Sequence, residues 1–157
     1  MTKNAIETFV DGVRAAWGPL TTEVVASCRQ HLEALTGASL EVEEGELHRD
    51  PEHGFLLLAH IEREGTYRVP HDHGGGWVIY ALVRGEVEMG TYARVVDANG
   101  TARVVRREES RMRAGECRVY LPGDIHDTHC LSRDALMLRF TSCDLKVEDR
   151  EGRMTRY

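Results

Sequence analysis

The sequence predicts a mainly β protein, a closed barrel or sandwich of short strands with two helices in front of it. Two observations support this fold class. The first 37 residues carry apolar side chains at helical spacing, whereas the chain after Ser39 consists of short segments rich in β-branched residues. Turn sequences separate those segments, and no helical pattern intervenes between them, which favours a barrel or sandwich.

The first predicted helix has one apolar stripe and a clear end. Asn4 and Glu7 have the spacing of a capping box, and Gly18-Pro19 ends the helix. The stripe consists of Ile6, Phe9, Val10, Val13 and Trp17.

The second predicted helix begins at Thr22, whose hydroxyl can cap it, and ends near Gly37. Its apolar stripe consists of Val25, Cys28, Leu32 and Leu35. We therefore expect one domain over residues 1–157, with a helical segment over 1–37 and the β-barrel over 38–157.

The predicted strands follow one another between turn signals such as Asp97-Ala98-Asn99-Gly100 and Pro122-Gly123-Asp124. They are the segments SLEVEE, GFLLLAHIERE, GWVIYALVRGEVEMGTYARVV, TARVVRRE, ECRVYLP, ALMLRFTSC and DLKVED.

Composition limits the classes of function. The formal net charge of -6 argues against nucleic acid as a bulk partner. No run of about 18 apolar residues suggests a membrane helix, and the first residues lack the apolar core of a signal peptide, so we expect a cytoplasmic protein. The four cysteines form no CxxC pair, which favours free thiols over a cysteine-only zinc site.

The segment RVPHDHGGGWVIY suggests a metal site. His71 and His73 are two residues apart, so in a strand their imidazoles project to the same side. Three glycines follow and allow a sharp turn or a close approach of the backbone. His126, in LPGDIHDTH, is a third candidate ligand. By itself an HxH pair is weak, because two surface histidines on a strand are common.

The wider spacing resembles the two motifs of the cupin superfamily. The first motif is matched by Gly65, five residues, His71-Asp72-His73 and finally Gly85. The second is matched by Gly115, five residues, Leu121-Pro122-Gly123 and His126. Three positions depart from the pattern, with Val78 in place of Glu, Leu121 in place of Pro and Cys130 in place of Asn. The resemblance implies a cupin barrel, a double-stranded β-helix or jelly roll, that binds a metal through His71, His73 and His126.

A cupin with three histidines and no glutamate resembles the cysteine dioxygenase-like branch, the thiol dioxygenases, which also carry helices before the barrel. This resemblance implies a non-haem Fe(II) oxidoreductase that uses O2 on a small thiol- or amino-acid-like substrate. Zn, Ni and Mn are alternative metals. The resemblance also suggests a homodimer, for which the first helix is a candidate contact.

Three further residues are candidates for the catalytic site. Arg49 has roughly the place of the family's substrate-binding arginine, and its alternative is a surface charge. Arg139 binds an anionic group if it points inward, and otherwise forms a salt bridge on the barrel wall. Tyr80 should face inward with Val78, where its hydroxyl either donates a hydrogen bond near the metal or is satisfied elsewhere. The family's Ser-x-His-x-Tyr triad is absent, because Met137, Arg139 and Thr141 hold those positions.

Neighbouring residues have weaker signals. Asp127 either hydrogen-bonds a ligand imidazole or lies on the surface. His129 has the wrong parity for a fourth ligand, and His60 is expected on the barrel wall. Trp77 should pack outward against the helices or a partner chain, and Cys130 should be a buried apolar filler.

Two other functions stay open at this point. One is a metal-dependent isomerase, lyase or hydrolase that uses another divalent metal as a Lewis acid. The other is a cupin that binds a ligand without turnover. Fold alone decides little between them, because one scaffold hosts many reactions.

Overall fold

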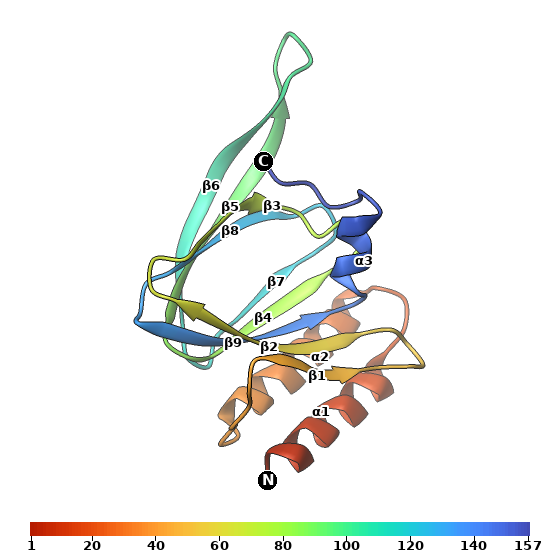
Figure 1. Ribbon diagram of the computed structural model, residues 1–157. Coiled ribbons are helices and arrows are strands. Elements are labelled where there is room, and N and C mark those ends of the chain that lie inside the picture. The colour runs from red at the N-terminus through yellow and green to blue at the C-terminus, as the bar shows by residue number, and fades with distance from the viewer.

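The computed structural model describes residues 1–157 as two β-sheets that face each other, with two long helices against one of them (Figure 1). The helices are α1 (Thr2–Ala16), α2 (Thr22–Gly37) and α3 (Leu145–Arg150). The strands are β1 (Gly45–Arg49), β2 (Leu56–Arg63), β3 (Tyr67–His71), β4 (Val78–Arg84), β5 (Glu86–Val96), β6 (Ala102–Arg113), β7 (Cys117–Tyr120), β8 (Ile125–Cys130) and β9 (Asp134–Thr141).

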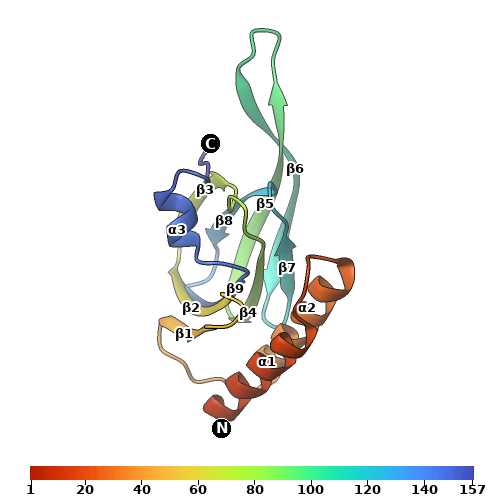
Figure 2. The ribbon, with the colours of Figure 1, turned by 90° about the vertical axis from the view of Figure 1, so that its right-hand side faces the viewer.

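The strand order shows why distant parts of the chain meet. One sheet has the order β1-β2-β9-β4-β7, and the other has the order β3-β8-β5-β6. All pairs are antiparallel. Because β2 pairs with β9 and β3 pairs with β8, each sheet joins strands that are far apart in the chain. Beyond the barrel, β5 and β6 continue as a projecting hairpin (Figure 2). The predicted barrel with two N-terminal helices is confirmed.

Strand alternation separates two hydrophobic cores. On β4, Ile79 and Ala81 face α1 and α2, whereas Val78, Tyr80 and Leu82 face the space between the sheets. The first core packs the helices onto the five-stranded sheet, and the second fills part of the barrel. Both faces of the five-stranded sheet therefore bury apolar surface, which is the main stabilising contribution to the fold. No helix is long and apolar enough to cross a membrane.

The first helix confirms the predicted stripe but not its cap. Phe9, Val10 and Val13 are buried. The helix begins at Thr2 with Met1 as its N-cap, so the predicted capping box of Asn4 and Glu7 is wrong. Asn4 lies inside the first turn, where its carbonyl accepts a hydrogen bond from the Thr8 hydroxyl.

The second helix starts from a cap one residue earlier than predicted. The side chain of Thr21, rather than Thr22, accepts the hydrogen bond from the Val24 amide. Val24 is buried with Cys28, Leu32 and Leu35, and Val25 is only partly buried.

Two predicted strands are wrong. The segment 39–44 forms no strand, although Leu40 and Val42 pack against the first core. The segment DLKVED contains the short helix α3, because the Asp144 side chain accepts a hydrogen bond from the Lys146 amide and caps the helix. Leu145 and Glu148, three residues apart, are then buried on one face.

Candidate metal centre

The histidine pair of the HxH segment lies where β3 ends and turns toward β4. His71 is the last residue of β3 and pairs with His126 of β8. The register of β3 shifts between Arg68 and His71. As a result the side chains of Arg68 and His71 both line the cavity, although residues three apart on a regular strand would face opposite sides. His73 follows in the turn, and its side chain is fully buried.

The glycines after His73 let this turn approach the C-terminal part of the chain. Gly74 has φ 61, a conformation that glycine adopts without strain, and a Cβ there would lie 3.2 Å from Arg153. The Gly75 amide donates to Glu148 Oε1 at 3.2 Å. A Cβ on Gly76 would lie 2.9 Å from the Cys143 sulfur. The expected close approach of backbone at these glycines is confirmed.

The last residues of the chain also hold the turn. The Asp72 amide donates to the Thr155 carbonyl at 3.0 Å, and Asp72 Oδ1 accepts from the Thr155 amide at 2.9 Å. The Tyr157 amide donates to the Pro70 carbonyl at 2.8 Å. His71 is thus flanked on both sides by backbone hydrogen bonds, which orient its ring.

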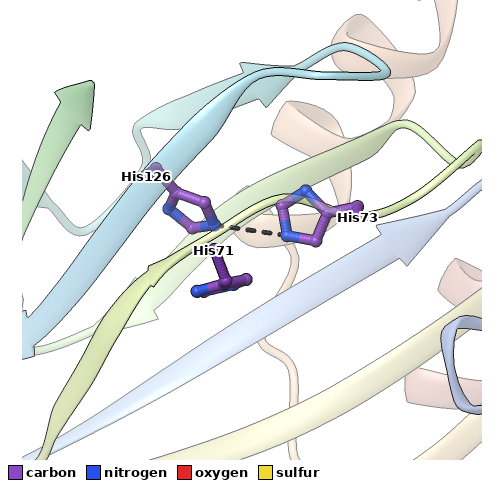
Figure 3. A group of neighbouring side chains, drawn as sticks. All are labelled: His71, His73 and His126. Atoms are coloured by element: carbon purple, nitrogen blue, oxygen red, sulfur yellow. Dashed lines mark hydrogen bonds between the residues drawn. The ribbon is translucent and has the colours of Figure 1, made fainter. Parts of the chain in front are cut away.

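The three imidazoles converge on one another (Figure 3). One ring nitrogen from each of His71, His73 and His126 lies within 4.8 Å of the others. The Nε2 atoms of His73 and His126 are 3.2 Å apart. Two nitrogens that share a cation at right angles, each about 2.1 Å from it, would be about 3.0 Å apart. The spacing therefore fits a shared metal ion.

The rings are also in the protonation state that a metal requires. Burial, with the charges of His71 and Arg139, lowers the pKa of His73 to about 3. Burial lowers the pKa of His126 well below its usual value and lowers that of His71 as well. Neutral imidazoles have a lone pair to donate.

Hydrogen bonds support the same conclusion. His71 Nδ1 donates to the Val69 carbonyl at 2.7 Å, so its Nε2 is the atom left to bind a metal. The Nδ1 atoms of His73 and His126 are buried without any partner. A buried imidazole nitrogen without a hydrogen-bond partner is costly, so both rings are incompletely satisfied by the chain alone. These three residues can therefore hold a metal ion, whose identity the donor set leaves open.

A cavity of about 350 Å³ lies beside the histidines and is lined by His71, Tyr80, Arg139, Glu62, Arg68 and Arg156, among others. Arg139 points inward, and its Nε is buried without a hydrogen-bond partner. A buried guanidinium nitrogen without a hydrogen-bond partner is costly unless a ligand satisfies it. Of the two orientations considered for Arg139, the structure has the one in which an anion can bind.

Tyr80 faces inward with Val78, as predicted. Its hydroxyl lies 3.3 Å from His73 Nε2, and burial raises its pKa, so the phenol stays protonated. Val78 is fully buried, so the position that carries glutamate in the usual cupin motif offers no metal ligand here.

Arg49 lies away from this cavity, contrary to expectation. It is half exposed at the end of the edge strand β1, where it forms ion pairs with Glu46 and Asp144. It borders a smaller hollow of about 150 Å³, which Arg139 also borders. Its carboxylate neighbours already occupy its guanidinium, which is why it does not serve as a free anchor in the larger cavity.

Asp127 is neither a partner of an imidazole nor a surface residue. It lies on the outer face of the four-stranded sheet, because it follows His126 directly on β8 and consecutive strand residues face opposite sides. It is nevertheless buried. It accepts hydrogen bonds from the Tyr67 hydroxyl, the Tyr92 hydroxyl and the Gly90 amide.

Other predicted positions agree with the structure. His129 lies outside the histidine group, and Trp77 stacks on Trp17 of the helical segment. Cys130 is buried in the second core, and all four cysteines are free thiols.

Sequence reasoning missed a charged cluster in the cavity. His60 was expected on the wall, and it does line the cavity with Glu62 and Arg68. Alternation along LLLAHIERE was the available signal, because it places His60 and Glu62 on the inward face with Leu58.

No protein-family model and no curated protein matches the chain. Solved structures do resemble it. The cupin domain of Schizosaccharomyces pombe Cnp3 has a TM-score of 0.50 and 13% identity, covering 73% of this chain and 72% of that one. KdgF from Halomonas sp. has a TM-score of 0.49 and 19% identity, covering 64% of this chain and 81% of that one.

Recombinant oxalate oxidase in complex with glycolate has a TM-score of 0.46 and 21% identity, covering 57% of this chain. The chain spans only 42% of the length of that oxidase. At 13% identity the likeness to the Cnp3 cupin domain shows a shared fold alone, the double-stranded β-helix.

Proposed function

We propose that this chain, which has the cupin fold, is a non-haem Fe(II) dioxygenase that oxidises a small thiol- or amino-acid-like substrate with O2. The observation that supports the proposal most strongly is the set of three neutral imidazoles beside a cavity that also holds the guanidinium of Arg139, whose Nε has no hydrogen-bond partner. A thiol would be converted to a sulfinate, R–SH and O2 giving R–SO2H, so no additional reductant is needed.

His71, His73 and His126 would hold the iron, with Zn, Ni or Mn as alternatives. Three uncharged ligands would leave the positive charge of Fe(II) unneutralised, and the iron would supply the redox chemistry when bound. The chain's part is to keep the three rings neutral and oriented, which burial and the Val69 carbonyl do.

Arg139 would bind a carboxylate of the substrate. Its guanidinium can form two parallel hydrogen bonds with a carboxylate, and the one acidic side chain in the cavity, Glu62, is paired with Arg68 instead. Arg139 on β9 and His71 on β3 line the same cavity from the two facing sheets, so a ligand bound by Arg139 would lie in the cavity that His71 also lines. Holding a substrate in one orientation beside the reacting centre is itself a large contribution to rate.

Tyr80 would hold a proton near the metal ligands. Its protonated hydroxyl lies beside His73 Nε2 and can donate a hydrogen bond to a bound substrate. Val78, Met137 and Leu82 surround this part of the barrel with apolar side chains, which restricts access of water.

Oxygen consumption tests the proposal directly. Protein purified anaerobically is assayed for metal content, loaded with Fe(II), and mixed with a panel of small thiols in an oxygen electrode. We expect thiol-dependent oxygen uptake, sulfinate as product, and loss of both in His71→Ala. Turnover of a substrate without O2, under Zn, Ni or Mn, would support an isomerase, lyase or hydrolase instead. Tight binding without turnover under every metal would indicate a ligand-binding cupin.

A further inference from the structure

Glu62 is the only acidic side chain that lines the cavity. It lies on β2 with its side chain directed inward and is 3% exposed. Its Oε1 accepts a hydrogen bond from Arg68 Nε at 2.6 Å and lies 3.0 Å from His60 Nε2. Both contacts are made by Oε1, so Oε2 remains available to accept a hydrogen bond from a ligand in the cavity.

The carboxylate is held in its charged form. Burial by itself would raise the pKa of Glu62, but the bonds from His60 and Arg68 hold it below its usual value. Arg68 also contacts His60 Nε2 at 2.8 Å, so three side chains fix one another. The position of Oε2 is therefore set before any ligand arrives.

A purely structural role explains only half of this arrangement. The Arg68–Glu62 pair joins β3 to β2 and so links the two sheets. That role needs Oε1 alone. It does not require a carboxylate that lines the cavity and keeps its second oxygen available to a ligand.

Glu62 and Arg139 lie at different ends of the same cavity. On the paired strands Arg139 is opposite Leu58, four residues along β2 from Glu62, which puts the two Cα atoms about 13 Å apart. His71 lines the cavity as well. A ligand that reaches all three would contact a cation, an anion and the metal ligands at separate points.

We propose that Glu62 binds a positively charged group of the ligand, an ammonium, and so selects ligands that carry an amino group. The inference deepens the proposed function, since it concerns the same cavity, but it makes a claim about binding that does not require turnover. A carboxylate with one free oxygen is a good acceptor for an ammonium, and the other two ends of the cavity suit an anion and a metal-binding atom.

Matched ligand pairs test it. The Zn(II)-loaded protein is titrated calorimetrically with L-cysteine and 3-mercaptopropanoate, and separately with L-alanine and propanoate. The members of each pair differ by the ammonium group. We expect the amino member to bind about 10- to 100-fold more tightly. Glu62→Gln keeps an oxygen for Arg68 and His60 but loses the charge, so it should abolish that preference.

Glu64→Gln is the control, because it removes an exposed charge two residues farther along. It should leave the preference unchanged. The inference is overturned if the wild type shows no preference, if it binds none of the four ligands, or if Glu62→Gln either leaves the preference intact or weakens both members of a pair equally. If Glu62→Gln does not fold, the preference of the wild type decides. If Fe(II)-loaded protein consumes no O2 while the preference persists, the dioxygenase proposal fails and this one stands.

Discussion

His73 Nε2 and His126 Nε2 lie 3.2 Å apart although 53 residues separate them in the chain. The approach depends on the pairing of β3 with β8, which sets His71 opposite His126 and brings the following turn over the same strand. Both rings are buried and neutral, so bulk water does not replace the contact between their Nε2 atoms. This contact is the centre of the candidate site.

Replacing His126 with alanine should remove metal binding. The variant loses one of three nitrogens, and we expect metal affinity to fall at least about 100-fold. Metal stoichiometry measured by mass spectrometry of desalted protein checks this, with His129→Ala as the control because His129 lies on the same strand outside the group. Equal metal content in the two variants would show that the histidines are not the ligands.

Arg139→Met should separate ligand binding from stability. Loss of the guanidinium removes the anchor for a carboxylate, so the affinity for propanoate should fall about 10- to 100-fold. The midpoint of thermal unfolding should not fall, because a buried guanidinium nitrogen without a partner is replaced by an apolar chain of similar length. Arg84→Met, which breaks an exposed pair with Asp134, should leave propanoate affinity unchanged. A large drop in unfolding midpoint for Arg139→Met would mean that the arginine has a structural partner.

Glu148 should affect metal affinity through the turn that contains Gly74, Gly75 and Gly76. Its Oε1 accepts the Gly75 amide, and its side chain also pairs with Arg153. Glu148→Ala leaves the Gly75 amide without this acceptor and loosens the turn that carries His73, so metal affinity should weaken about tenfold. Glu148→Gln keeps an acceptor oxygen and should recover most of the affinity.

The control for Glu148 is Glu151→Ala, because Glu151 is half exposed and pairs with the same Arg153. Chelator competition gives the affinity, and the absorption spectrum of the Co(II)-substituted protein reports ligand geometry. A spectrum and an affinity that stay unchanged in Glu148→Ala would rule out the positioning role.

Asp50 should make stability depend on pH in the acid range. Burial would raise its pKa, but hydrogen bonds from the His53 amide, Arg14 and His48 lower it below 3.8. Its contribution is therefore complete above the unfolded pKa and is lost as pH falls through the folded value. We expect wild type to exceed Asp50→Asn by about 1–3 kcal/mol at pH 7, with the gap closing below about pH 4.

Urea unfolding between pH 7 and pH 3 measures this difference. Asp11→Asn is the control, since Asp11 is exposed on α1. A gap between wild type and Asp50→Asn that keeps its size at pH 3 would show that the carboxylate charge is not responsible.

Gly90→Ala should destabilise the four-stranded sheet. A Cβ at this position would lie 2.6 Å from Asp127 Oδ1, the oxygen that accepts the Gly90 amide. Displacing that buried carboxylate strains its bonds to Tyr67 and Tyr92, and we expect a loss of about 2–3 kcal/mol. Gly37→Ala, where a Cβ meets nothing within 4 Å, should be neutral or stabilising by up to about 1 kcal/mol. Equal unfolding free energies for the two variants would contradict the packing argument.

Patterns of residue spacing predicted the parts of the fold that local physics controls. The stripe of Phe9, Val10 and Val13 is buried, and Val78 and Tyr80 share the inward face, because side chains repeat with the period of the helix or strand. The segment 39–44 alternates like a strand but has no neighbour to pair with, and the strand prediction failed there. Pairing is a property of the assembled sheet, which a single segment does not contain.

In the candidate site, too, residue spacing predicted some features and the assembled sheets decided others. Motif spacing predicted which three histidines belong together, whereas Arg49 and Arg139 were equal candidates until the sheets were assembled. Arg139 lies on a central strand between β2 and β4, so its side chain is enclosed, and Arg49 lies at the end of an edge strand among acidic residues. The role of an arginine therefore followed from which strands flank it.

By itself the amino-acid sequence determined the periodicity of the regular elements, the inward or outward parity of residues on regular strands such as β4, and the types of side chain available as ligands. Only the tertiary structure decided which groups stay available to a ligand, namely Arg139 Nε, which has no hydrogen-bond partner, and the Glu62 oxygen that Arg68 and His60 do not contact. The physical reason is that local steric preferences act over a few residues, whereas burial and ion pairing depend on neighbours that the folded chain brings from far along the sequence.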